Sequence, residues 1–163
     1  MDDKPIIFNS IGIIETPFTD LADMPIQPSA AEGVKGKIIL HPVLERGLQD
    51  MEGFSHLILL YHFHQAGDSN LLVKPFLDEN IHGVFATRAP RRPNAIGLSI
   101  VRLLEIQQNI LSITNVDILN GTPLLDIKPY VPYFDKPEAD RMGWLENFQK
   151  KIGGKYSDDR FLE

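Results

Sequence analysis

The apolar residues of this chain fall into short runs separated by turn signals, and this pattern limits the fold more than any other feature. The longest run, Phe54–Phe63, has the length and aromatic content of a buried strand. No strand alternates with a long helix as a βαβ unit requires, and no glycine-rich phosphate loop follows a strand. The pattern predicts a mainly β protein, a single antiparallel or mixed β-barrel with short helices. Six further strands are expected, at Ile6–Glu15, Lys37–Leu40, Gly83–Thr87, Ile96–Ile106, Ile110–Ile118 and Leu124–Ile127.

Local signals refine three of these strands. Gly12 indicates a bulge or the close approach of another backbone. The segment Gln107–Asn109 predicts a tight hairpin between its two neighbours. The alternation of apolar and polar residues changes face near Asn115, which predicts a bulge there.

Helical periodicity occurs twice. A helical turn is expected at Val43–Met51, with apolar residues at helix spacing. One long helix is expected at Glu138–Ile152, because Met142, Leu145, Phe148 and Ile152 share one face. We therefore expect a barrel domain over residues 1–137, with a C-terminal helix and tail at 138–163 packed on it.

Charge and cysteine content exclude several classes of protein. The chain of 163 residues has no cysteine, which excludes disulfides, thiolate metal sites and a cysteine nucleophile. Its net charge of −6 means that a nucleic acid would need a local basic patch. No apolar run approaches 18 residues and no signal-peptide pattern is present, so we expect a cytoplasmic protein without a membrane partner.

Three arginines lie together between Gly83 and Ser99, in the sequence GVFATRAPRRPNAIGLS. Pro90 and Pro93 exclude a helix interior or a central strand, so the segment is expected to be a stiff loop. Guanidinium groups held in such a loop suit a planar or anionic ligand. The alternative is a surface turn whose arginines only pair with nearby carboxylates.

Histidines and acids offer other chemistry. His56, His62 and His64 are candidate zinc ligands, but no carboxylate lies nearby in sequence, and the favoured interpretation is hydrogen bonding beside a cavity, with no metal. The strand acids Glu105, Asp117 and Asp126 must be paired or hydrogen-bonded, and Asp126 is a candidate for a structural ion pair with the arginine loop. No nucleophile elbow favours a hydrolase.

Four segments together resemble the TrmO-type tRNA methyltransferases, also called the TsaA-like or YaeB-like family. They are IGIIETPF, GFSHLILLYHFH, GVFATRAPRRPNAIGLS and NGTPLLDIKPYVP, which span most of residues 6–135. The resemblance implies a β-barrel homodimer that binds S-adenosylmethionine near the subunit interface. It also implies methylation of the exocyclic amine of threonylcarbamoyl-adenosine next to the tRNA anticodon.

The resemblance assigns residues to three roles. Cofactor contacts are expected at Pro28, Ser29, Ala30, His64, Gln65, Arg88, Leu98, Leu119, Asn120, Gly121 and Thr122. Asn120 stands where family members often have Asp. Contacts to the RNA are expected from Arg91, Arg92, Asn94, Lys128 and Tyr133. Catalytic roles are expected for Asp126, Tyr130 and Arg92, and the proton of the amine could pass to Asp126, His64 or Tyr130.

Two other functions fit the same residues. One is a regulatory module that binds S-adenosylmethionine without catalysis. The other is methylation of another RNA or of a small molecule.

Overall fold

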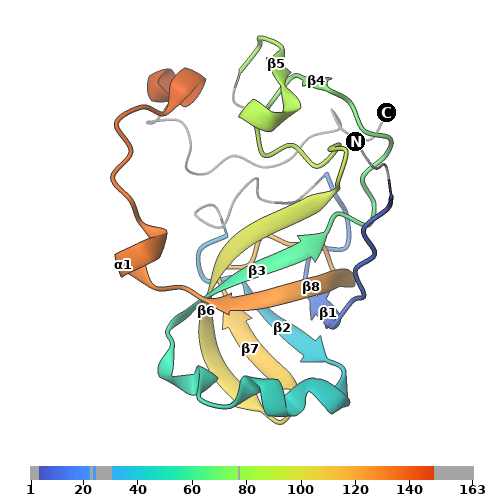
Figure 1. The fold of residues 1–163 in the computed structure, drawn as a ribbon, viewed down its shortest axis with the longest axis vertical. Coiled ribbons are helices and arrows are strands. Elements are labelled where there is room, and N and C mark those ends of the chain that lie inside the picture. The colour runs from blue at the N-terminus through green and yellow to red at the C-terminus, as the bar shows by residue number, and fades with distance from the viewer. Residues whose placement is uncertain (1–3, 23, 25–30, 77, 149–163) are drawn as a thin grey trace.

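Six antiparallel strands close into a barrel in the computed structural model, which describes residues 4–22, 24, 31–76 and 78–148. The order around the barrel is β1-β2-β7-β6-β3-β8 (Figure 1). The expected β-barrel is therefore confirmed, and every neighbouring pair is antiparallel. The strands are β1 (Gly12–Glu15), β2 (Lys35–Leu40), β3 (His56–His62), β6 (Ile96–Gln107), β7 (Ile110–Thr114) and β8 (Thr122–Pro129).

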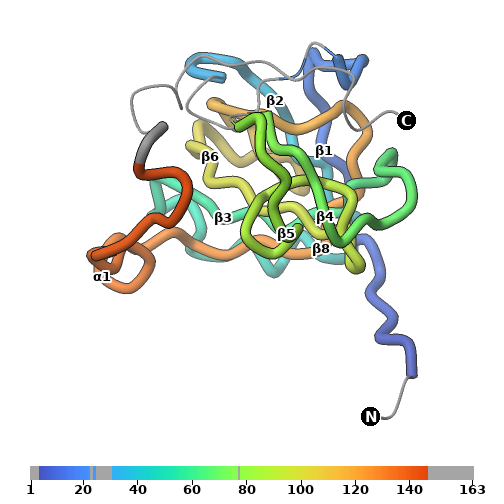
Figure 2. The backbone as a smooth tube through the Cα atoms, turned by 90° about the horizontal axis from the view of Figure 1, so that it is seen from above, coloured from blue at the N-terminus to red at the C-terminus, as the bar shows by residue number. Residues whose placement is uncertain are grey.

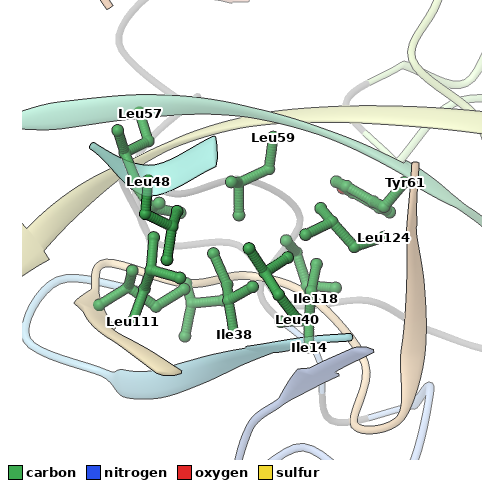
Figure 3. Close-up of a cluster of buried hydrophobic side chains, with 13 residues drawn as sticks. Ile14, Ile38, Leu40, Leu48, Leu57, Leu59, Tyr61, Leu111, Ile118 and Leu124 are labelled. Atoms are coloured by element: carbon green, nitrogen blue, oxygen red, sulfur yellow. The ribbon is translucent and has the colours of Figure 1, made fainter. Parts of the chain in front are cut away.

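The core fills the inside of the barrel with alternate residues of each strand. Leu57, Leu59 and Tyr61 point inward from β3 (Figure 3). Tyr61 lies next to Leu124 of β8, at one end of this apolar cluster (Figure 3). Successive side chains of a strand point to opposite faces, and this alternation accounts for the three inward-pointing residues.

Different short elements lie at the two ends of the barrel. The 3-10 helices η2 (Pro42–Leu48) and η3 (Met51–Gly53) lie at one end, where Leu48 joins the core (Figure 1). Beyond the other end lies a two-stranded sheet, β4 (Leu72–Val73) and β5 (His82–Gly83), followed by the 3-10 turn η4 (Val84–Ala86) (Figure 1).

The remaining described elements follow β8. They are α1 (Pro132–Asp135) and the 3-10 helix η5 (Gly143–Phe148). Within the described part of the chain, no helix is long and apolar enough to span a membrane.

The first strand is shorter than expected, but the expectation for Gly12 is confirmed. Strand β1 begins at Gly12, and the residues before it lead away from the barrel (Figure 2). A Cβ at Gly12 would collide with the carbonyl oxygen of Ile39 on β2. Gly12 is therefore required by close backbone approach.

The hairpin between β6 and β7 is confirmed, whereas the bulge near Asn115 is wrong. Strand β7 ends at Thr114, and Asn115 follows with a φ of 62°. Its Oδ1 accepts a hydrogen bond of 2.9 Å from the Gly33 N–H. The apolar face changes because the strand ends there and the chain turns.

The strand expected at Gly83–Thr87 is also mostly wrong. Only Gly83 belongs to a strand, and the next three residues form the η4 turn. The Thr87 hydroxyl and amide both bond to the Val84 carbonyl, and these local bonds replace a strand ladder.

The long helix expected at Glu138–Ile152 is wrong over the residues described. Residues 138–142 are not helical, and η5 begins at Gly143 with a φ of 59°, a left-handed conformation that interrupts an α-helix. Trp144 instead donates its Nε1–H to the Ala86 carbonyl at 2.9 Å and stacks on His82 at 4.6 Å between ring centroids. Residues 149–152 lie outside the described part of the chain.

Candidate functional site

Three strands bring polar residues to one end of the barrel. Because β3 runs antiparallel to both neighbours, its last residues lie where β6 and β8 begin, and Tyr61 pairs with Gly97 and Leu124. We call this region the Tyr61 end of the barrel.

A buried chain of hydrogen bonds crosses the Tyr61 end. The Tyr61 hydroxyl lies 3.0 Å from Ser99 Oγ, which donates to Asp117 Oδ1 at 2.7 Å. A serine hydroxyl has one hydrogen, so Tyr61 must be the donor to Ser99. Tyr61 is 5% exposed and Ser99 is 2% exposed. A Cβ at Gly97 would collide with the Tyr61 ring, so glycine allows the ring to lie over β6.

Burial controls the ionisation of this chain. It raises the pKa of Asp117 from 3.8 to about 6, against the hydrogen bond from Ser99 and the positive charge of Arg88, which both lower it. Burial, followed by the charge of Asp117, also raises the pKa of Tyr61. At pH 7 Asp117 is therefore ionised although its surroundings disfavour the charge, and the neutral Tyr61 hydroxyl is a hydrogen-bond donor.

His64 lies just beyond the end of β3 and contacts the start of β8. Its Nδ1 is 3.4 Å from Thr122 Oγ1, and the Thr122 hydroxyl donates to the Leu119 carbonyl at 2.7 Å. Because that hydroxyl hydrogen is used, the contact is a hydrogen bond only in the tautomer that carries its hydrogen on Nδ1, which has the lone pair on Nε2. Burial, then the charge of His62, lowers the pKa of His64 from 6.5, so the imidazole is neutral at pH 7.

The turn from Leu119 to Thr122 is fixed by its backbone. The Asn120 N–H donates to the Phe18 carbonyl at 2.8 Å, and the Gly121 N–H donates to the Ile14 carbonyl at 2.9 Å. Gly121 has a φ of 75°, which favours glycine. Asn120 Oδ1 accepts from the Thr16 N–H at 3.1 Å. The Asn120 amide oxygen therefore holds two loops together.

Arg92 bonds to carbonyl groups of the arginine loop. Its Nη1 donates to the carbonyls of Val84, Thr87 and Ala89 at 3.2, 2.9 and 3.4 Å. Its guanidinium also lies 5.9 Å from the centre of the Phe85 ring. One edge of Arg92 thus stabilises the loop, while no hydrogen bond is made by its Nε or Nη2 with the described residues.

The other two arginines of the loop differ from each other. Arg91 Nε donates to the Asp68 carbonyl at 2.9 Å. Arg88 is exposed and makes no hydrogen bond or ion pair with any described residue, yet its charge lowers the pKa of both Tyr61 and Asp117. Arg88 is therefore a nearby cation available to a ligand at the Tyr61 end.

Asp126 lies on the outer face of the barrel, opposite Leu60 of β3. Its Oδ2 is 2.7 Å from Lys128 Nζ, and its Oδ1 accepts from the Ile127 N–H at 2.9 Å. Among the described residues, Asp126 pairs with Lys128, so the alternative of an ion pair with the arginine loop is wrong. Leu98 pairs with Leu60, as Asp126 does, and its exposed side chain shares this outer face.

Tyr130 lies at the opposite end of β3 from His64. Its N–H donates to the His56 carbonyl at 3.0 Å, and the seven residues from His56 to His62 span about 20 Å of extended strand. Within the chain, Tyr130 does not join the polar groups around Tyr61. Tyr133, on α1, is 94% exposed.

Comparison with known protein families shows to which family the chain belongs. The family model for the tRNA-methyltransferase O N-terminal domain matches residues 13–136. The chain belongs to the TrmO family. A Pyrococcus abyssi relative, named a probable S-adenosyl-L-methionine-binding protein, is 55% identical over 157 residues, which cover 96% of this chain and 85% of the relative.

Two other matches are to proteins of which this chain spans less than two thirds. The rat tRNA (adenine(37)-N6)-methyltransferase is 36% identical over 142 residues, and the match covers 82% of this chain but 32% of the rat protein. The crystal structure of TrmO from Pseudomonas aeruginosa matches with a TM-score of 0.73 and 38% identity, over 86% of this chain and 63% of that chain.

The structure brings together part of the set of residues predicted to contact the cofactor. His64 and the turn from Leu119 to Thr122 meet at the Tyr61 end, with Arg88 close by and exposed Gln65 next to His64. Leu98 faces outward from β6, and exposed Asn94 precedes that strand. Pro28, Ser29 and Ala30 lie outside the described residues.

Sequence reasoning missed the joint position of Tyr61, Ser99 and Asp117. One signal was available, since Ser99 is a polar residue at an inward position between Gly97 and Val101 of β6, and a buried hydroxyl needs a partner. Among the described residues, no group of three or more histidine or acidic side chains forms a metal site.

Proposed function

We propose that this protein transfers the methyl group of S-adenosylmethionine to the exocyclic amine of threonylcarbamoyl-adenosine beside a tRNA anticodon. The observation that carries the proposal is the meeting of Arg88, neutral His64 and the Leu119–Thr122 turn at the Tyr61 end. The names of two archaeal relatives, from P. abyssi and Archaeoglobus fulgidus, support the cofactor, and the name of the rat relative supports the adenine amine.

The charges at the Tyr61 end fit S-adenosylmethionine. This cofactor carries a carboxylate, an ammonium group and a sulfonium, so its site needs charged groups of both signs. Arg88 suits the carboxylate by bidentate pairing, and the Leu119–Thr122 turn supplies a fixed wall beside His64. When bound, the cofactor supplies a methyl group that is activated for displacement by its positive sulfur.

The chain must then align the amine and accept its proton. An adenine amine is a weak nucleophile, so alignment and exclusion of water account for much of the rate. Neutral His64 has its lone pair on Nε2 and suits the role of proton acceptor. Asp126 is paired with Lys128 on the outer face, and Tyr130 lies at the opposite end of β3, so His64 is preferred to both.

The RNA contacts remain predictions that the exposed side chains support. Arg91 and the remaining edge of Arg92 suit the threonyl carboxylate. Tyr133 offers a surface on which a splayed anticodon base can stack, and Lys128 suits a phosphate. A homodimer and a cytoplasmic location also remain predictions.

Mass spectrometry of tRNA nucleosides tests the reaction. Purified protein with S-adenosylmethionine and tRNA carrying threonylcarbamoyl-adenosine should yield the methylated nucleoside, and cells without the gene should lack it. If the protein binds the cofactor but leaves every tRNA nucleoside unchanged, the regulatory module becomes the better conclusion. The P. abyssi relative, named only for binding, favours this second candidate.

Two arginine variants separate cofactor binding from substrate binding. Arg88→Ala should weaken cofactor binding in calorimetry about tenfold or more, which corresponds to about 1.4 kcal/mol. Arg92→Ala should lower methylation more than it lowers cofactor affinity, because Arg92 also stabilises the loop that carries Arg88. Arg46→Ala, on η2 at the other end of the barrel, is the matched loss of one positive charge and should change neither quantity. If Arg88→Ala binds the cofactor as tightly as the wild-type protein does, Arg88 does not contact the cofactor.

A further inference from the structure

The hydrogen-bond chain at the Tyr61 end has one direction and ends on one carboxylate oxygen. Tyr61 donates to Ser99, and Ser99 donates to Asp117 Oδ1. The three residues come from β3, from β6 and from the loop between β7 and β8. Two strands thus fix the orientation of a side chain that lies outside both. Such a network holds the Asp117 carboxylate in one position.

In the part of the chain that the structure describes, no cation pairs with that carboxylate. Among the described residues, no lysine, arginine or histidine nitrogen lies within 4.0 Å of an Asp117 oxygen. Arg88 is close enough to affect its ionisation but forms no ion pair with it. Asp117 is partly buried, and a carboxylate withdrawn from water is normally paired or loses its charge. The one direct stabilising contact from another side chain is the Ser99 hydroxyl, and Asp117 Oδ2 has no side-chain donor in the described part of the chain.

The charges around Asp117 fit a ligand cation. The charged and titratable groups that act on it are Tyr61 from β3 and Arg88 from the arginine loop. Tyr61 stays neutral, and His64 at the same end is neutral at pH 7. Neither supplies the missing positive charge, and Arg88 is separately suited to a carboxylate. A ligand that carries both an anionic and a cationic group would satisfy Arg88 and Asp117 together.

We propose that Asp117 pairs with a positively charged group of S-adenosylmethionine, with Ser99 and Tyr61 holding its carboxylate in place. The positive group is the methionine ammonium or the sulfonium, which share this chemistry. The inference rests on the cofactor part of the proposed function and not on the tRNA reaction.

Calorimetry with three ligands tests the pairing and distinguishes the ammonium from the sulfonium as the partner of Asp117. Asp117→Asn should weaken S-adenosylmethionine binding at pH 7.5 about tenfold or more. If the sulfonium is the partner, affinity for S-adenosylhomocysteine, which lacks that charge, should be unchanged. If the ammonium is the partner, affinity for S-adenosylhomocysteine should fall as well, while 5′-methylthioadenosine, which lacks the ammonium, should bind both proteins equally.

Two further variants test the role of Ser99 and control for the loss of a negative charge. Ser99→Ala should weaken binding less than Asp117→Asn does, because the carboxylate remains but loses its donor. Glu45→Gln removes one negative charge from exposed η2 at the other end of the barrel and should leave affinity unchanged. Asp117→Asn binding within twofold of the wild type would overturn the inference, and so would a wild-type protein that does not bind the cofactor.

Proton release provides an independent readout. A cation beside Asp117 favours the ionised carboxyl, so cofactor binding near pH 6 should release up to about half a proton from this residue. Calorimetry in two buffers of different ionisation enthalpy measures the release, which should be smaller in Asp117→Asn by that amount. Equal release in the two proteins would contradict the pairing. If Asp117→Asn loses affinity but the wild type methylates no tRNA, the pairing stands and the proposed reaction falls.

Discussion

Replacing Asp117 by asparagine should stabilise the protein above pH 6, although it removes a hydrogen-bonded group. Burial raises the pKa of Asp117 to about 6, so its ionisation at neutral pH opposes folding. Asparagine keeps an oxygen that can accept the Ser99 hydrogen bond and carries no charge. The substitution therefore removes the cost of a buried charge while it retains the contact.

The size of the effect follows from the two pKa values. The carboxyl titrates near 3.8 in the unfolded chain and about 6 in the folded protein. The folded state therefore binds more protons between these values, and stability falls as the pH rises. At 1.36 kcal/mol for each tenfold change in proton affinity, the cost is about 1 kcal/mol at pH 4.5 and about 3 kcal/mol at pH 7.5.

Urea unfolding of both proteins from pH 4.5 to pH 7.5 measures this cost. The gain in unfolding free energy from Asp117→Asn should grow by about 2 kcal/mol over that range. Other titrating groups, including His64, are present in both proteins and cancel in the difference. Glu45→Gln should show no such growth. A difference that stays constant within about 0.5 kcal/mol would refute the argument that Asp117 is ionised at a cost in the folded protein.

Three further outcomes are expected. Gly97→Ala should lower the unfolding free energy by about 1–3 kcal/mol, because its Cβ would overlap the Tyr61 ring; Gly53→Ala, which meets open space, is the control, and equal losses would contradict the overlap. Trp144→Phe keeps an aromatic ring but loses the indole hydrogen bond, so the unfolding free energy should fall by about 0.5–1.5 kcal/mol. An unchanged unfolding free energy would show that this hydrogen bond does not contribute to stability. Because burial lowers the pKa of His64 from 6.5, methylation should keep its full rate down to below pH 6.5 and fall only in more acid solution; His64→Gln should lose most of the rate, and an unaltered pH profile in that variant would exclude His64 as proton acceptor.

Local patterns in the sequence predicted much of the barrel. Alternation at Leu57, Leu59 and Tyr61 places one face of β3 inside, and two-residue periodicity is a property of any extended strand. Gly12 and the hairpin before Ile110 were predictable because steric limits on backbone conformation act within a few residues. The family motifs likewise lie in continuous segments.

Only the tertiary structure decided which distant residues meet at the Tyr61 end. Tyr61 and Ser99 are 38 residues apart, and Ser99 and Asp117 are 18 apart, so their contact depends on the register of closed strands. The same holds for Trp144, 58 residues from the Ala86 carbonyl to which it donates. Helical periodicity predicted a helix over Glu138–Ile152. The left-handed conformation of Gly143 and the bond from Trp144 to Ala86 outweigh that local helical preference. The sequence by itself determined most strands of the barrel, because their periodicity is local. Closure of the barrel decided that the partly buried Asp117 carboxylate is oriented by Ser99 and unpaired with any cation of the described residues.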